Sequence, residues 1–422
     1  MAIADDRSNW LLAGWLAVHR WPLTMRFQTR RTLALVLLCL FLFGALIYKI
    51  NNSPLVNQNG ILREYLVESQ VSVGTRPGTR TILLWSSFFG NRRWSLPSDT
   101  LGPQQFRDDL NCPVYQCELS NRHDFLPSLE LYDAIVYHVA QPFPLLLPLP
   151  TRRSPHQAYV FALMEPPGET KHQLNDEQHF YNLTMTYRLD SDIVWPYAHV
   201  VDNLTGARVA PSRFPYWREP PALGSWNDST VARLWHTKTK MAAWFVSHCK
   251  TLSEREKLAA ALQQHIQVDI YGQCGPLNCA RDDPHCNEML DTDYLFYLAF
   301  ENSLCTDYVT EKLYDALQRH IVPVVFGGAN YSRFLPPHSY IDANRFDSIE
   351  QLAQHLRFVA ADQQEYISYF WWRQHYRLET SSPFCELCAR LHQSSWTHKT
   401  QSYNNIESWW YNGCRLTSHI RF

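Results

Sequence analysis

The sequence has almost no excess of charge of either sign. Its 422 residues include 38 lysines and arginines and 40 aspartates and glutamates, which gives a formal net charge of −2. Proteins that bind nucleic acids usually carry a marked basic excess, so this balance argues against a nucleic-acid partner. The length is sufficient for two domains, each with a substantial core.

A second Cys-x-x-Cys pair is also lacking. Cys385 and Cys388 form the single pair with this spacing, whereas a zinc site of this kind needs two such pairs. Of the eleven cysteines, Cys39 lies in a long apolar run, which leaves ten in the rest of the chain. In an oxidising compartment these ten would form disulfide bonds.

No small-x-small cleavage site follows the long apolar run at residues 32–48. Residues 1–31 precede this run, which is more than a cleaved signal peptide would have, so the sequence predicts an uncleaved anchor. Three arginines between residues 26 and 31 place the N-terminus in the cytosol. We therefore expect a cytoplasmic tail over 1–31, a single transmembrane helix over 32–50 and a lumenal remainder.

The lumenal part begins with a polar stretch without periodicity, residues 51–78, which is typical of a stem. The following pattern of elements predicts a first α/β lobe at 79–225, a second lobe at 226–380 and a C-terminal tail at 381–422. Five Asn-x-Ser/Thr sequons fit a protein of the secretory pathway. They begin at Asn51, Asn182, Asn203, Asn227 and Asn330.

The most informative stretch runs from residue 296 to residue 328. Its apolar segments 296–300 and 321–326 predict two strands, and Thr310 between them can cap a helix. A helix that begins after a strand favours an anion at its N-terminus, and Lys312 in the first turn is placed to share that anion. The alternative is an ordinary buried strand–helix–strand unit with a solvated Glu–Lys pair. The helix would bury Leu313, Ala316 and Leu317.

Three motifs in this stretch resemble the donor-site signature of the α1,3-fucosyltransferases. They are Phe-Glu-Asn-Ser at 300–303, Asp-Tyr-Val-Thr-Glu-Lys at 307–312 and Val-Pro-Val-Val at 322–325. That family is Golgi-resident, inverting and dependent on GDP-fucose, and it does not depend on a metal cofactor. The resemblance implies a GT-B fold, in which two Rossmann-like lobes face a cleft and the second lobe binds GDP-fucose.

In the second lobe, the apolar runs 241–247 and 268–271 predict two further strands. A helix between them can be capped by Thr251 or Ser253. The order of strands and helices implies a parallel, doubly wound sheet with right-handed crossovers. Two more helices are expected, over 348–361 and 363–376, and Asp347 or Ser348 would cap the first.

The resemblance implies which residues of this lobe bind the diphosphate. Ser247 and Arg255 would touch it, and Arg255 and Lys312 would neutralise the charge that builds up on the leaving GDP. Without the resemblance, Arg255 on a helical turn would be an ordinary solvated surface residue. His248 stands where the family usually has asparagine.

The resemblance also implies contacts with the rest of the nucleotide. Glu311 would contact the ribose or orient Lys312, and Tyr297 would line the nucleotide pocket. The candidates for donor binding are completed by two residues of the first motif, Glu301 and Asn302.

A candidate catalytic base lies in the first lobe. Glu165 follows an apolar run and precedes two prolines, which leaves its carboxylate at the edge where open α/β sheets bind ligands. A carboxylate in a partly dry cleft can take the proton of an acceptor hydroxyl. The family carries its base in a similar Glu-Ser-Pro setting, although Pro166 replaces the serine here. A surface glutamate before a turn, and His248 as the base, are the alternatives. Strands are expected at 81–85, 134–138 and 158–163.

The segment Tyr-Arg-Leu-Asp-Ser-Asp at 187–192 also resembles the family. Asp190 and Asp192 could hold Mn²⁺ or Mg²⁺ with a diphosphate, as Asp-x-Asp motifs do in another class of glycosyltransferase. The alternative is structural pairing with Arg188, which we favour because the resembled family does not depend on a metal. A divalent ion would then stimulate the reaction at most.

The resemblance suggests that Cys385 and Cys388 reach back to Cys112 and Cys117 and attach the C-terminal tail to the first lobe. Cys249 with Cys305 would be a plausible bond within the second lobe. The other pairs would come from Cys274, Cys279, Cys286 and Cys414.

Together these features predict an inverting transferase in the Golgi membrane that moves L-fucose from GDP-β-L-fucose to the 3-hydroxyl of N-acetylglucosamine in a glycoprotein glycan. The acceptor stays open between the chitobiose core of N-glycans, N-acetyllactosamine antennae and a LacdiNAc-like terminus. The loop between Cys274 and Cys286 and the insertion at Cys305 resemble the core-modifying members of the family more. Two alternatives also stay open: a GT-B enzyme that uses another nucleotide sugar, and an inactive lumenal protein that binds glycans.

Overall fold

The computed structural model describes residues 78–140, 152–169, 179–280, 283–393, 402–415 and 420, which belong to one compact unit, Val73–Phe422. The predicted cytoplasmic tail at 1–31, the predicted transmembrane helix at 32–50 and Asn51 lie outside the described residues. Among the residues that are described, no helix combines the length and the apolar character that a membrane span needs.

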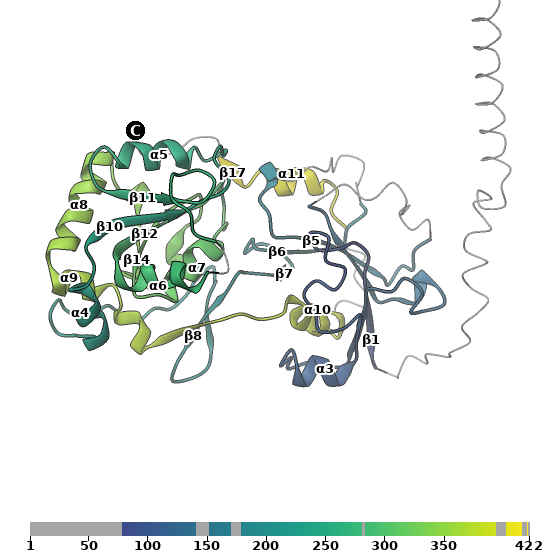
Figure 1. Ribbon diagram of the computed structural model, residues 1–422. Helices are drawn as coiled ribbons and strands as arrows, with labels where there is room; N and C mark the ends of the chain where they lie inside the picture. The colour runs from purple at the N-terminus through teal and green to yellow at the C-terminus, as the bar shows by residue number, and fades with distance from the viewer. Residues whose placement is uncertain are drawn as a thin grey trace, which may run out of the picture. The chain divides into compact units, whose positions relative to one another are not determined.

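The first lobe contains a seven-stranded sheet in the order β2-β3-β1-β4-β5-β6-β7, parallel except for β2 (Figure 1). Its central strands β4 and β5 are buried along their whole length, as expected when both faces of a parallel sheet are covered. The three predicted strands are confirmed, and β1 begins and ends one residue earlier than expected. The strands are β1 (Arg80–Leu84), β2 (Thr100–Leu101), β3 (Cys117–Ser120), β4 (Ala134–His138), β5 (Ala158–Leu163), β6 (Leu183–Thr186) and β7 (Ile193–Val194).

The second lobe contains a five-stranded parallel sheet in the order β11-β10-β12-β14-β15, which confirms the doubly wound arrangement (Figure 1). Helices α5, α8 and α9 contribute to the core on one face, and α6 and α7 to the core on the other. The strands are β10 (Lys240–Phe245), β11 (Val268–Tyr271), β12 (Tyr294–Phe300), β14 (Val322–Phe326) and β15 (Ile341–Asp342). The helices are α4 (Ser229–Trp235), α5 (Arg255–Leu262), α6 (Pro284–Thr292), α7 (Glu311–Leu317), α8 (Ile349–Ala361) and α9 (Gln363–Ser368).

Two of the predicted helix caps are confirmed and one is wrong. Thr310 caps α7, whose predicted buried stripe is buried, and Ser348 caps α8. Helix α5 instead begins after Glu254, which has a left-handed backbone and makes no side-chain cap. The hydroxyl of Ser253 is not available for capping because it donates to the backbone oxygen of Glu301, at 2.7 Å.

The predicted helix over 363–376 is also wrong in its second half. The helical segment α9 stops at Ser368, a 3₁₀ turn covers Trp371–Gln374, and β16 (Tyr376–Glu379) follows. This strand pairs with β8 (His199–Asp202), which in turn pairs with β9 (Arg208–Ala210). The edge of β8 thus offers backbone partners that a local sequence pattern does not reveal.

Five disulfides join the ten cysteines beyond residue 77. Cys112–Cys385 and Cys117–Cys388 attach α10 (Pro383–Leu391) to the first lobe, as the resemblance implied. The predicted pair Cys249–Cys305 is wrong. Cys249 follows β10 and bonds Cys274, which follows the neighbouring strand β11. The two remaining bonds are Cys305–Cys414 and Cys279–Cys286.

Cys305 and Cys414 also face each other in a two-stranded ladder of β13 (Leu304–Cys305) and β17 (Cys414–Arg415). Because α11 (Ile406–Tyr411) packs in the core of the first lobe, this disulfide ties that lobe to the segment that follows Glu301.

We expect the double variant Cys305→Ser/Cys414→Ser to lose up to about 5 kcal/mol of unfolding free energy, because the bond closes a span of 109 residues. The control is Cys279→Ser/Cys286→Ser, whose bond spans 7 residues and should cost about 2 kcal/mol. Denaturant titration of the purified chain measures both. Equal losses would contradict the assigned role of the longer span.

Candidate active site

Most of the predicted donor residues lie where the sheet of the second lobe changes its winding direction. Strands β10 and β12 are neighbours, and the helices that follow them lie on opposite faces, so their carboxyl ends open a crevice. Ser247 follows β10 and is exposed, and Arg255 opens α5. Glu301 and Asn302 follow β12 directly. This is the position at which sheets of this kind bind nucleotides.

The centre of this crevice is an ion pair between Glu301 and Lys312. The ammonium nitrogen of Lys312 lies 3.1 Å from a carboxylate oxygen of Glu301, 3.1 Å from one of Glu311 and 2.7 Å from the hydroxyl oxygen of Thr310. The Glu301 side chain is 1% exposed, whereas those of Lys312 and Glu311 are 22% and 46% exposed. Lys312 is therefore the cation that reaches solvent at this helix N-terminus.

Burial and charge act in opposite directions on this pair. Burial raises the pKa of Glu301, and the nearby ammonium of Lys312 only partly offsets this effect. Burial would lower the pKa of Lys312, but the carboxylates of Glu301 and Glu311 outweigh it and raise that pKa. Lys312 thus stays charged and able to hold an anion.

Arg255 lies at the same edge, but its side chain is buried and bonded to the backbone. The guanidinium donates to the backbone oxygen of Phe300 at 2.6 Å and to that of His248 at 3.2 Å. Burial lowers the pKa of Arg255. The group therefore fixes the end of β12 against the loop after β10, and it also places a positive charge beneath the crevice.

Three buried polar atoms near this edge have no hydrogen-bond partner within the described part of the chain. They are Nε of Arg255, Oδ1 of Asn302 and Oγ of Ser303. Buried polar groups are normally paired, so a group of unpaired donors and acceptors in one place fits a polar ligand that supplies the partners. A nucleoside diphosphate sugar has such groups.

Tyr297 does not join these polar side chains. It belongs to the core that also contains Leu313 of α7, is 8% exposed, and its ring meets that of Phe245 edge-on at 5.8 Å. Burial raises the pKa of Tyr297. Its position supports the floor of the crevice.

Glu165 lies at the corresponding edge of the first lobe, after the carboxyl end of β5, and is half-buried. The hydroxyl of Tyr197 donates to the backbone oxygen of Met164 beside it, at 3.1 Å. Gly168 follows, and a Cβ on that glycine would lie 2.1 Å from a methyl carbon of Leu252 and 3.9 Å from the hydroxyl oxygen of Ser303. The segment after β5 therefore packs directly on the loops of the second lobe that border the crevice.

Two buried tyrosines, Tyr197 and Tyr308, are influenced by the charges of both Glu165 and Glu301. Burial raises the pKa of Tyr197 and of Tyr308 well above the ordinary value, and the carboxylates of Glu165 and Glu301 add to the effect at both phenols. The charges of both carboxylates therefore act on the same two phenols. His248, the alternative base, is exposed after β10 on the second lobe.

The two aspartates of the predicted metal motif in the first lobe accept hydrogen bonds from other groups of the protein. Arg188 donates two hydrogen bonds to Asp190, at 2.8 and 2.7 Å, as the structural alternative predicted. Asp192 accepts from the backbone and hydroxyl of Thr184 and from the hydroxyl of Tyr403. Among the described residues, the one group of side chains spaced to share a metal ion is Cys117, Cys388 and His392, and its two cysteines form a disulfide.

The predicted sequons differ in exposure. Asn203, Asn227 and Asn330 are exposed. Asn182 is half-buried, and its side-chain oxygen accepts the backbone N–H of Tyr159 at 2.8 Å.

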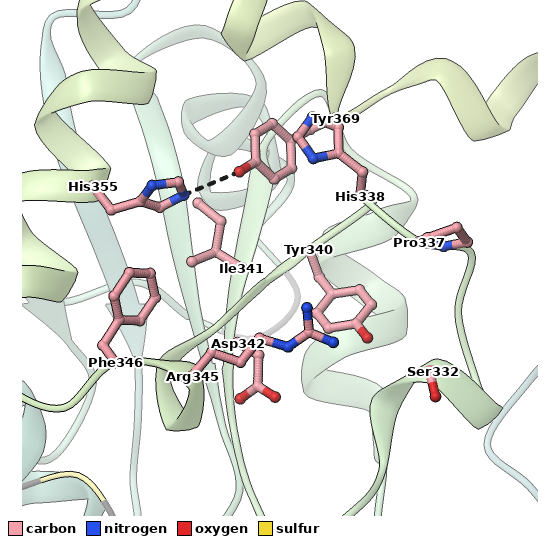
Figure 2. A pocket seen from close by; sticks show the side chains of 10 residues that line it. All are labelled: Ser332, Pro337, His338, Tyr340, Ile341, Asp342, Arg345, Phe346, His355 and Tyr369. Atoms are coloured by element: carbon pink, nitrogen blue, oxygen red, sulfur yellow. Dashed lines mark hydrogen bonds between the residues drawn. The ribbon is translucent and has the colours of Figure 1, made fainter. Parts of the chain in front are cut away.

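A separate cavity of about 280 Å³ lies beside the edge strand β15 (Figure 2). In it, Nε2 of His355 lies 3.2 Å from the hydroxyl of Tyr369, which stacks on the ring of His338. Arg345 and Tyr340 line the opposite side. None of the predicted donor or catalytic residues lines this cavity.

The sequence did not reveal the role of three residues that shape the site. Thr310 was expected only as a helix cap, Ser253 was expected as another, and Tyr197 was not singled out. The hydrogen bond of Ser253 to Glu301 joins residues that are 48 positions apart in the sequence, and that of Thr310 to Glu301 joins residues that are 9 positions apart. Tyr197 gave no signal beyond its aromatic neighbourhood.

The fold is a two-lobed α/β arrangement with a candidate nucleotide-binding site in the second lobe. Comparison with known proteins then gives the family. The model of glycosyltransferase family 10 (fucosyltransferase), C-terminal part, matches residues 235–409, and the N-terminal fucosyltransferase model matches residues 77–198. The chain belongs to this family, and its activity is that of an α1,3-fucosyltransferase.

Relatives of known name agree. Alpha-(1,3)-fucosyltransferase C of Drosophila melanogaster is 65% identical over 92% of this chain and 91% of its own length. Alpha-(1,3)-fucosyltransferase fut-1 of Caenorhabditis elegans is 33% identical over 73% of this chain and 67% of its own length. A crystal structure of an α1,3-fucosyltransferase with GDP-fucose covers 81% of this chain and 97% of its own, with 14% identity and a TM-score of 0.45, which is too distant to define the site here.

Proposed function

We propose that this enzyme transfers L-fucose from GDP-β-L-fucose to the 3-hydroxyl of an N-acetylglucosamine in a glycoprotein glycan, with inversion. The observation that carries the proposal is the charged, partly exposed Lys312 at the start of α7, whose ammonium lies 3.1 Å from the buried carboxylate of Glu301. Glu165, half-buried after β5 of the first sheet, is the candidate base. Family membership supports fucose as the transferred sugar.

In the proposed reaction, the acceptor oxygen attacks the anomeric carbon of fucose from the face opposite the diphosphate. The bond from the anomeric carbon to the diphosphate oxygen breaks, and GDP leaves with the electron pair. Glu165 takes the acceptor proton. Lys312, helped by the positive charge of Arg255 and the N-terminus of α7, stabilises the charge on the leaving diphosphate.

We also propose that the enzyme is anchored in the Golgi membrane through residues 32–50, with its catalytic lobes in the lumen. The apolar run and the arginines before it support the anchor. The five disulfides of the lobes support an oxidising compartment.

The test is transfer of labelled fucose from GDP-fucose by the purified full-length chain to a panel of defined glycans, with N-glycan cores and N-acetyllactosamine antennae as separate arms. We expect transfer to at least one glycan that ends in or contains accessible N-acetylglucosamine, with an α1,3 product by NMR. Transfer should continue in EDTA, because the described acidic pair is held by protein groups. The proposal would be refuted if the chain binds glycans but neither transfers fucose to them nor hydrolyses GDP-fucose.

A further inference from the structure

We propose that Glu301 and Thr310 are positioning residues: together they form a buried anchor that holds the ammonium of Lys312 toward the donor, and neither touches the donor itself. The inference rests on the proposed use of a nucleoside diphosphate sugar at this site. It changes the role of Glu301, which the sequence suggested as a donor ligand, and gives a second role to Thr310.

Both carboxylate oxygens of Glu301 are bonded inside the protein. One accepts the backbone N–H of Thr310 at 2.8 Å. The other accepts the hydroxyl of Thr310 at 3.0 Å and lies 3.1 Å from the ammonium of Lys312. With 1% of its side chain exposed, Glu301 has no surface left for a ligand.

The hydroxyl of Thr310 links the two charged groups. It gives its single proton to Glu301, and its oxygen accepts from the ammonium of Lys312 at 2.7 Å and from the backbone N–H of Lys312 at 3.5 Å. One donor and two acceptor positions are all that a hydroxyl has, so the group is fully used. The hydroxyl oxygen of Thr310 therefore both caps the helix and holds the ammonium of Lys312.

This arrangement leaves one N–H of the Lys312 ammonium pointing away from the buried pair. A lysine ammonium has three N–H donors on a flexible stem. Two of them point to the buried oxygens of Thr310 and Glu301, and the third faces Glu311, at 3.1 Å, whose side chain is 46% exposed. A phosphate oxygen of the donor can take the place of the Glu311 carboxylate without disturbing the buried pair.

The anchor is also fixed to the sheet. The backbone N–H of Glu301 donates to the backbone oxygen of Phe326 at the end of β14, at 2.8 Å, and the hydroxyl of Ser253 donates to the backbone oxygen of Glu301 at 2.7 Å. The carboxylate is thus held by two neighbouring segments before any donor arrives. Such a pre-arranged charge needs little reorganisation during the reaction.

The test compares Thr310→Val, which keeps the shape and removes the hydroxyl, with Thr310→Ser, which keeps the hydroxyl. We expect Thr310→Val to lower kcat/KM for GDP-fucose about 10- to 100-fold, mainly through a higher donor KM, because hydrogen bonds to a charged group are lost. Thr310→Ser should stay within about threefold of the wild type, and the acceptor KM should change in neither variant.

The matched control is Ser348→Ala. It removes the cap of α8, where the Ser348 hydroxyl oxygen accepts the backbone N–H of Gln351, far from any predicted donor residue in the sequence. We expect its melting temperature to fall as much as that of Thr310→Val, with donor kinetics unchanged. If Thr310→Val shows only this loss of stability, Thr310 is merely a cap and the proposal is wrong.

Binding of GDP, measured by calorimetry on the full chain, separates this inference from the proposed function. A wild type that binds GDP but transfers no fucose would refute the proposed function, and weaker GDP binding by Thr310→Val and by Glu301→Gln would still support the anchor. Wild-type GDP affinity in both variants would overturn it. A wild type that does not bind GDP would overturn both.

Discussion

Replacement of Lys312 by alanine is expected to lower kcat/KM for GDP-fucose about 100- to 1,000-fold, the cost usual for loss of one fixed group that stabilises a developing anion. The reason lies in its position. Lys312 lies at the start of α7 with 22% of its side chain exposed. Arg255, in contrast, is buried, and its guanidinium donates to backbone oxygens. No second cation described near this helix start takes over its contact.

The variant also leaves Glu301 buried without its cation, so stability has to be measured beside activity. Lys312→Arg keeps the charge but cannot place a planar guanidinium where a compact ammonium fits between Thr310 and Glu301, and we expect it to be impaired as well. The control is Lys257→Ala: this lysine lies on α5, is 59% exposed and pairs with Glu254. Wild-type kinetics in Lys312→Ala at an unchanged melting temperature would contradict the assigned role.

Several strands could be predicted from the sequence because their pattern is set locally. Strands β4, β5 and β11 have the predicted bounds, since short runs of apolar residues between turns leave little choice. The cap of α7 could be recognised for the same reason. Strands β8 and β16 could not, because they pair with each other across a long stretch of the chain.

The candidate site also has features that the sequence predicts and features that it does not reveal. The motif that contains Glu301 and Lys312 predicts the donor site, and the structure places both residues at the switch point of the second sheet. What the sequence could not give is which atoms are used up inside the protein. Arg255 was expected to bind phosphate with a free guanidinium, but two of its N–H groups hold backbone oxygens. Cys249 was paired wrongly because the order of strands places β11, and not β13, beside β10.

Replacement of Glu165 by glutamine is expected to lower kcat for transfer about 100- to 10,000-fold, the range for loss of a general base. Glutamine keeps the size of the side chain and cannot take the acceptor proton. The affinity for GDP should stay at the wild-type value, because the predicted donor residues belong to the second lobe. Rapid-quench measurement of transfer together with calorimetry of GDP binding checks both expectations.

The alternative base gives this experiment its sharpest control. His248 is exposed after β10, on the same lobe as the predicted donor residues, whereas Glu165 follows β5 in the first lobe. We therefore expect His248→Ala to retain transfer within about threefold, and Glu130→Gln in the first lobe to behave like the wild type. If His248→Ala abolishes transfer while Glu165→Gln retains it, the proton goes to the histidine, and the acceptor must approach from the donor side.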